Sequence, residues 1–240
     1  MPFMPYYYGI DWTYLVLVLP FVIISLIASA KVNSTFKKYS KQLSSRRITG
    51  AQAAQRVLLS NGVTNVRIER IAGNLTDHFD PKTNVIRLSD SVYGSTSTAA
   101  IGVACHEAGH AVQHATAYAP IKIRSAFVPV ANIGSALAIP LIILGLLFAS
   151  FGEYSQMIVN IGIFCFSFSF LFQVITLPVE FNASRRALNA IADGDILTNT
   201  ELKGARRTLT AAAMTYMAAA AASLAQLLRL IILFGGRDRD

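Results

Sequence analysis

The chain has 240 residues, of which 53% are hydrophobic and only 14% are charged, and its formal net charge is +8. The apolar residues are gathered in blocks, which excludes an ordinary soluble domain and predicts a membrane protein. The positive charge does not indicate nucleic-acid binding, because it is concentrated in two segments that flank apolar blocks. The two cysteines, Cys105 and Cys165, lie inside apolar segments, which favours a reducing compartment over a disulfide.

The first apolar block, Trp12 to Ala30, is uncharged throughout and is long enough to cross a bilayer core. A cleaved signal peptide is the alternative, because Ala28-Ser29-Ala30 imitates a cleavage site. However, the residues before the block contain no Lys or Arg, and the basic residues follow it. We therefore predict that residues 1–30 form a retained anchor whose N-terminus lies outside the cytoplasm.

Residues 31–125 are expected to form a folded cytoplasmic segment. A short amphipathic helix is predicted after Thr49, its cap, ending just before Gly62. The stretches VTNVRIERIAG and TNVIRLSD alternate apolar and polar residues and predict a β-hairpin whose loop is NLTDHFDPK. A helix that contains ACHEAGHAVQH follows, with a Ser or Thr near position 97 as its cap.

Two further apolar blocks, 126–150 and 156–178, predict a transmembrane hairpin over residues 126–178. Its prolines, Pro129 and Pro140, are tolerated in membrane helices. The fold class is therefore a predominantly α-helical integral membrane protein with a small α+β, zincin-like cytoplasmic part.

Residues 179–210 form a second cytoplasmic segment, and residues 211–240 contain an alanine-rich block from Ala211 to Phe234. This last block either spans the membrane or packs as a helix against the other helices, so that three or four helices cross in total.

The distribution of basic residues predicts the orientation in the membrane. Residues 31–125 carry 13 Lys and Arg and residues 179–210 carry 5, so 18 of the 21 fall in these two segments. Two crossings separate the segments, which therefore share one side, and their positive charge makes that side cytoplasmic.

His106-Glu107-Ala108-Gly109-His110 is an H-E-x-x-H sequence. On a helix, His106 and His110 lie one turn apart on one face and can bind one zinc ion. Glu107 is the candidate general base, which takes a proton from the attacking water. His114 lies two turns, about 12 Å, from His106 and is too far to share the ion, so we expect a structural or supporting role for it.

The third zinc ligand should come from the other cytoplasmic segment. Glu180 follows the third apolar block directly, and Pro178 before it suits the first turn of a new helix. A carboxylate there completes a His₂Glu site with one open position. A Glu180 that merely complements a helix N-terminus is the alternative.

Three stretches, VACHEAGHAVQH, EFNAS and LTDHFDP…VIRLSDSVYG, closely resemble the YugP-like family of small bacterial membrane zinc metallopeptidases. More distantly, the chain resembles the heat-shock membrane protease HtpX and the CAAX prenyl proteases. The resemblance implies an integral endopeptidase of the bacterial cell membrane, with His106, His110 and Glu180 on zinc and Glu107 as base. Polypeptide substrates and the lipid bilayer are its expected partners.

The distant relatives have an acidic residue where this chain has Ser184, so Ser184 is expected to form a weaker hydrogen bond to a ligand histidine. The resemblance also implies an edge strand that pairs with substrate, and NVIRLS, which begins at Asn84, is the candidate. An ordinary structural strand is the alternative for this stretch. His78 and Arg185 or Arg186 are further candidates for binding substrate or the oxyanion.

Two other functions remain open from the sequence. A site-2-type intramembrane protease would use an Asp as third ligand, and Asp193 or Asp195 is available. The polar SDSVYGSTST before the motif argues against a spanning helix there. A non-catalytic zinc-binding scaffold is the other possibility, although zinc binding alone does not require Glu107.

Overall fold

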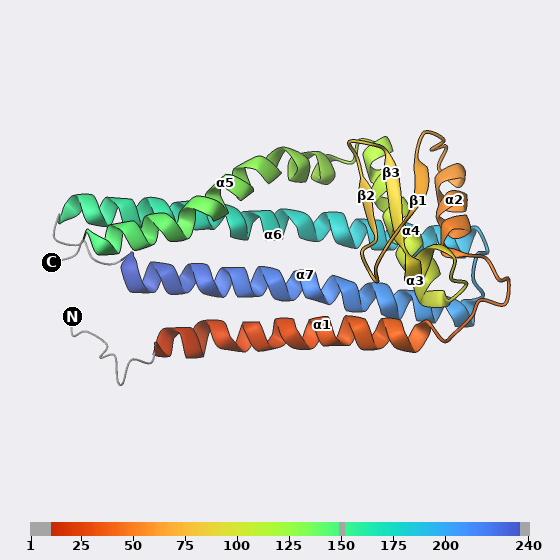
Figure 1. Ribbon diagram of the computed structural model, residues 1–240, viewed down its shortest axis with the longest axis horizontal. Helices are drawn as coiled ribbons and strands as arrows, with labels where there is room; N and C mark the ends of the chain where they lie inside the picture. Colours follow the sequence, from red (N-terminus) through yellow and green to blue (C-terminus); the bar gives the residue numbers. More distant parts are fainter. Residues whose placement is uncertain (1–10, 149–151, 236–240) are drawn as a thin grey trace. The chain divides into compact units, whose positions relative to one another are not determined.

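The computed structural model describes residues 11–148 and 152–235. A short π-helix at Tyr14–Val18 leads into the first long helix, and Figure 1 labels the elements. These are α1 (Leu19–Tyr39), α2 (Gly50–Ser60), β1 (Arg67–Ile71), β2 (His78–Asp80), β3 (Val85–Ser89), α3 (Asp90–Tyr93), α4 (Thr98–Ala115), α5 (Ala119–Leu147), α6 (Glu153–Asp193) and α7 (Asn199–Phe234).

Within residues 11–148 and 152–235, four helical segments are long and apolar enough to cross a membrane, namely Tyr14–Tyr39, α5, α6 and α7. The expected fold class, a helical membrane protein with a small α+β part, is confirmed. The chain divides into two compact units. The apolar unit lies within Met1–Ile27, Arg124–Ile175 and Tyr216–Asp240, and the α+β unit comprises Ala28–Ile123 and Thr176–Thr215.

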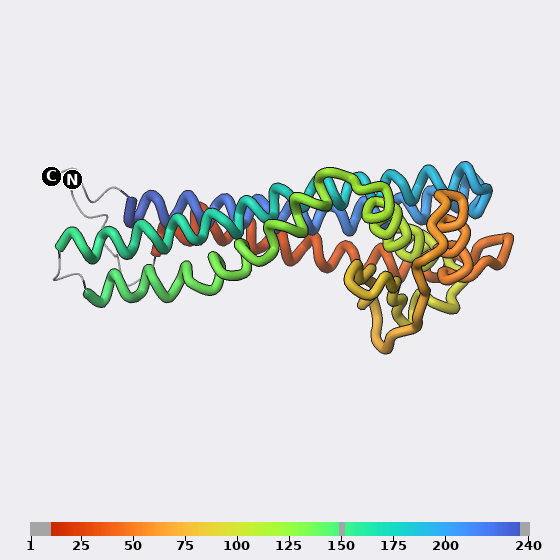
Figure 2. The backbone as a smooth tube through the Cα atoms, turned by 90° about the horizontal axis from the view of Figure 1, so that it is seen from above, coloured from red at the N-terminus to blue at the C-terminus, as the bar shows by residue number. Residues whose placement is uncertain are grey.

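Within the apolar unit, α5 and the first part of α6 run side by side in both views (Figures 1 and 2). Glycines allow this close approach. A Cβ on Gly145 would meet the Val159 side chain at 2.5 Å, and one on Gly162 would meet the Ala138 carbonyl oxygen at 2.9 Å. Small residues at helix crossings are typical of membrane helix packing.

The sheet differs from the expected hairpin. The strand order is β1-β3-β2, with β1 parallel to β3 and β2 antiparallel to it. The two predicted strands therefore pair in parallel, and the hairpin partner of β3 is β2, which lies in the predicted loop. Gly73 (φ +114°) and Leu75 (φ +56°) turn the chain back, and the segment from 72 to 84 is long enough to make a parallel connection.

NVIRLS is not an edge strand. Strand β3 has a neighbour on both sides, and its Val85, Ile86 and Leu88 are fully buried. Asn84 lies before the strand, with φ +51°, in the turn from β2. The edge strands of the described sheet are β1 and β2, so the expectation that NVIRLS pairs with substrate is wrong.

Helix α4 lies in the core of the α+β unit, and most of its side chains are buried. Ser97 caps it by accepting a hydrogen bond from the Ala100 N–H at 3.2 Å, as predicted near this position. The predicted cap of α2 is also confirmed, since Thr49 forms a capping box with Gln52. Gly62 follows that helix at φ +70°.

Helix α6 continues through Pro178, so the prediction of a new helix at this proline is wrong. The helix runs from Glu153 to Asp193, and Glu180 lies in its interior. A proline removes one backbone hydrogen bond, a loss that membrane helices tolerate. The complete burial of Val179, Ala183 and Ala187 after the proline favours continuation of the helix.

Candidate metal centre

Three candidate ligand atoms meet in the α+β unit. His106 Nε2 and His110 Nε2, both on α4, lie 3.1 Å apart. Glu180 Oε2, on α6, lies 3.3 Å from His106 Nε2 and 3.5 Å from His110 Nε2. Only 4% of the Glu180 side chain is exposed, and both histidine side chains are also largely buried.

The spacing of these atoms suits a zinc ion. In a tetrahedral site with bonds of about 2.0–2.1 Å, ligand atoms lie about 3.3 Å apart. The three observed separations bracket that value. Beyond the two ring nitrogens, buried Glu180 Oε2 has no hydrogen-bond partner among residues 11–148 and 152–235, which would be costly without a cation. The residues therefore fit the metal.

A close helix crossing brings the ligands together. A Cβ on Gly109 would lie 2.7 Å from the Ala183 carbonyl oxygen, so only glycine allows α4 and α6 to approach this far. Gly109 precedes His110, and Ala183 lies three residues after Glu180. The small residue within the H-E-x-x-H sequence thus sets the distance between the histidines and the carboxylate.

Each histidine has a partner for its second ring nitrogen. Ser184 Oγ lies 3.1 Å from His106 Nδ1, and Gln113 Oε1 lies 3.0 Å from His110 Nδ1. The Gln113 amide nitrogen donates to the Val179 carbonyl and to Asn182 Oδ1. Gln113 must therefore accept at Oε1, so His110 Nδ1 donates and its Nε2 keeps the lone pair that a metal needs.

Sequence reasoning missed Gln113. It lies three residues after His110, on the same helix face, and is completely buried. A polar residue three positions after a candidate ligand was the available signal in the sequence. The prediction named His114, one residue further along, instead.

Glu107 is 8% exposed and lies near a second carboxylate, that of Asp77. Burial, together with the negative charge of Glu107, raises the pKa of Asp77, although hydrogen bonds from Ser89 oppose this. Burial lowers the pKa of His110, but the carboxylates of Glu180 and Glu107 outweigh burial and raise it above its ordinary value. The carboxylates of Glu180 and Glu107 thus favour positive charge at His110, as is expected of a cation site.

The remaining candidates lie outside the ligand cluster. His114 is exposed, and its ring packs against Phe79 with centroids 5.9 Å apart. His78 is exposed at the start of β2, with Nδ1 2.9 Å from the Thr76 carbonyl oxygen. Arg185 is exposed and lines a separate pocket of about 320 Å³ that also includes Ser184.

The alternative aspartates are not near the histidines. Asp193 ends α6, about 20 Å along the helix from Glu180. Asp195 forms an ion pair with Arg46 instead. Among the described residues, the cluster of possible metal ligands consists of His106, His110 and Glu180.

Helices able to span a membrane, combined with a candidate His₂Glu cluster on an H-E-x-x-H helix, are typical of a membrane metallopeptidase, and comparison with known proteins shows a family of this class. Residues 14–235 match the family model described as "Putative neutral zinc metallopeptidase", and the chain belongs to this family. The "Putative membrane protease YugP" of Bacillus subtilis (strain 168) is 44% identical over 218 residues, which cover 90% of this chain and 95% of that protein. The predicted YugP-like family is confirmed. No solved structure matches the chain.

Proposed function

We propose that this membrane protein is a zinc endopeptidase that hydrolyses peptide bonds at the cytoplasmic face of the cell membrane. The observation that carries the proposal is the 3.1–3.5 Å spacing of His106 Nε2, His110 Nε2 and Glu180 Oε2 beside Glu107. A zinc ion bound there would supply a Lewis acid, which polarises a peptide carbonyl and acidifies a water molecule.

The side chains divide the remaining work. Glu107 takes a proton from the attacking water and delivers it to the amine nitrogen of the departing half of the substrate. Ser184 and Gln113 hold the imidazoles in orientation through their Nδ1 atoms. The carboxylate of Glu107 has no hydrogen-bond partner in the described part of the chain, which leaves it available for this proton transfer.

Strand β2 is the best candidate to bind an extended substrate. It is an edge of the described sheet, and it lies against α4 through the contact between Phe79 and His114. The preceding Asp77 is close enough to Glu107 for their charges to interact. A polypeptide paired with the free edge of β2 would therefore pass near the general base.

The charge distribution supports a cytoplasmic site in the plasma membrane. The ligands lie in the segments 31–125 and 179–210, which hold 18 of the 21 Lys and Arg residues. A site-2-type mechanism is less well supported, because Glu180 rather than Asp193 lies beside the histidines. A non-catalytic scaffold would leave Glu107 without a role.

The test is zinc content per chain in detergent-purified protein. Wild type should hold about one zinc, Glu180→Gln should lose or strongly weaken it, and Asp193→Asn and His114→Ala should retain it. Glu107→Gln should keep its zinc but lose casein hydrolysis by at least a hundredfold, because general-base catalysis contributes about 10²–10⁴. Zinc loss in Asp193→Asn but not in Glu180→Gln would refute the ligand set, and full activity in Glu107→Gln would refute the mechanism.

A further inference from the structure

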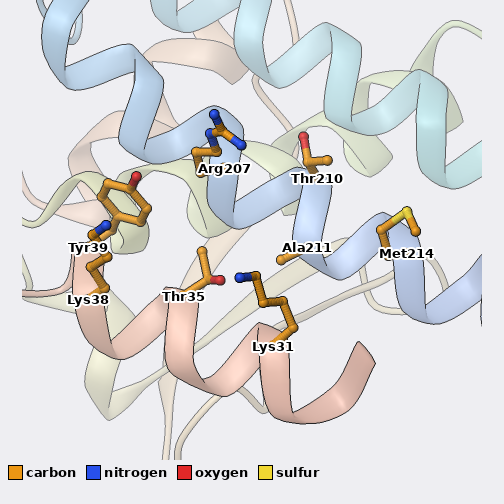
Figure 3. Close-up of a pocket in the computed structure, with 8 residues that line it drawn as sticks. All are labelled: Lys31, Thr35, Lys38, Tyr39, Arg207, Thr210, Ala211 and Met214. Carbon is orange, nitrogen blue, oxygen red and sulfur yellow. The ribbon is translucent and has the colours of Figure 1, made fainter. Parts of the chain in front are cut away.

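A cationic pocket lies between α1 and α7 within the α+β unit. Its volume is about 360 Å³, within the usual range of small-molecule sites. Figure 3 shows the lining side chains on neighbouring stretches of the two helices, with those of Lys31, Thr35 and Ala211 in the space between the ribbons. The lining residues are Lys31, Thr35, Lys38 and Tyr39 from α1, and Arg207, Thr210, Ala211 and Met214 from α7.

The charges of this pocket are not compensated. Lys31, Lys38 and Arg207 contribute three positive charges, and no acidic residue is among the described residues that line the pocket. In the part of the chain that the structure describes, none of the three forms an ion pair, and Lys38 only lies over the Tyr39 ring at 5.5 Å. Hydroxyl groups of the lining Thr and Tyr residues add hydrogen-bond donors. Such a set suits a phosphate ester.

The pocket lies where both helices change from apolar to charged sequence. Lys31 is the first charged residue after the uncharged run Trp12–Ala30. Arg207 is the last charged residue before a second uncharged run, residues 208–228. This change marks the level at which the hydrocarbon of a bilayer gives way to phosphate headgroups. Ala211 and Met214 extend the wall of the pocket toward the apolar side.

We propose that this pocket binds the headgroup of an anionic phospholipid. The phosphodiester lies among Lys31, Lys38 and Arg207, and the glycerol end of the acyl chains lies against Ala211 and Met214. Basic pockets between membrane helices on the cytoplasmic side bind lipid headgroups in this way. A soluble phosphate ester or an acidic peptide offers the same negative charge. Neither would contact the apolar wall of the pocket, and neither would explain why the pocket lies at the level of the lipid headgroups.

Native mass spectrometry of the full chain in neutral detergent tests the proposal. Phosphatidylglycerol, phosphatidylcholine, glycerol 1-phosphate and an acidic peptide are added in separate arms. Wild type should bind phosphatidylglycerol in preference to all three others. The triple variant Lys31→Gln, Lys38→Gln, Arg207→Gln should bind it about a hundredfold more weakly, given on the order of a fivefold contribution per basic residue near a membrane surface.

The matched control is Lys37→Gln, Lys41→Gln, Lys203→Gln, which removes the same charge from exposed positions outside the pocket. It should bind like wild type. A charge-preserving variant, with Lys31 and Lys38 changed to Arg and Arg207 to Lys, should also retain the lipid. Zinc content equal to wild type shows that each variant is folded, independently of protease activity.

Three results would overturn the proposal. Equal losses in the pocket and control variants would show a diffuse charge effect. Equal binding of phosphatidylglycerol and phosphatidylcholine would exclude an anionic headgroup site. Pocket-dependent binding of glycerol 1-phosphate or the acidic peptide as tight as that of the lipid would identify a soluble ligand instead.

Discussion

Gln113 fixes the tautomer of His110 because all of its own hydrogen-bonding capacity on nitrogen is used by Val179 and Asn182. A glutamine in this position does what a carboxylate does in many zinc sites, without adding a negative charge. Ser184 acts similarly on His106, but through a hydroxyl that can either donate or accept. The tautomer of His110 is therefore fixed more firmly than that of His106, which makes His110 the better oriented of the two candidate ligands.

Replacing Gln113 with Leu should weaken zinc binding by about 10–100-fold, since loss of a partner that orients a ligand typically costs this much. Competition with a zinc chelator measures the change. Gln55→Leu, on the exposed face of α2, is the matched control and should bind zinc like wild type. Unchanged affinity in Gln113→Leu would show that Gln113 does not orient His110.

At the level of elements, the crossing of α4 and α6 determines whether the three ligands can meet. Its closeness depends on Gly109, which faces the backbone of Ala183. Backbone atoms cannot move aside as a flexible side chain can, so an added methyl group must separate the helices.

Gly109→Ala should therefore destabilise the fold by about 1–3 kcal/mol through overpacking and should weaken zinc binding at least tenfold. Thermal unfolding and chelator competition measure the two effects. Gly94→Ala is the control, because a Cβ there meets nothing within 4 Å. If Gly109→Ala binds zinc as tightly as Gly94→Ala, the crossing does not set the ligand geometry.

The sequence predicted those elements whose signals are local. The caps at Thr49 and Ser97 and the apolar blocks needed only neighbouring residues. The sheet was mispredicted because β2 is too short for a periodic pattern, and because pairing direction depends on the turn near Gly73. The sequence also predicted wrongly that a new helix starts at Pro178. Helix α6 continues because the residues after the proline are buried, and burial depends on tertiary packing that the local sequence does not show.

For the candidate site, His106 and His110 could be predicted from their spacing in the sequence. Glu180 was chosen because the predicted membrane topology places it on the same side as the histidines. The role of Gln113 could not be predicted from the sequence, because its hydrogen-bond partners Val179 and Asn182 lie on α6, far along the chain. Contacts of that kind depend on how two helices cross, which no local pattern encodes.

At the scale of the whole molecule, the part of the chain that the structure describes has four helices long and apolar enough to span a membrane, and four crossings would place the start of the first and the end of the last on the same side. Arg229 is one of three basic residues outside the two basic segments, and it pairs with Asp11 at the start of the first apolar block. This pairing neutralises a charge that would otherwise oppose the predicted orientation.

Cysteine labelling checks that orientation. In a background with Cys105 and Cys165 changed to Ala, Tyr154→Cys should react with a membrane-impermeant maleimide in intact cells. Tyr154 is 73% exposed and lies at the start of α6, on the side predicted to be external. Arg56→Cys, exposed on α2, should react only after the membrane is opened. The reverse pattern would place the metal centre outside the cell.

The candidate ligands His110 and Glu180 are far apart along the chain, and the interval between them contains all of α5 and more than half of α6. During synthesis the two histidines therefore leave the ribosome well before Glu180 does. In the proposed site, a nascent chain would hold only the two histidine ligands, and would bind zinc weakly, until the helical hairpin of α5 and α6 had entered the bilayer and Glu180 had been synthesised. Under the proposed function, proteolytic activity would then arise only after membrane insertion, which would protect cytosolic proteins from an enzyme still being made.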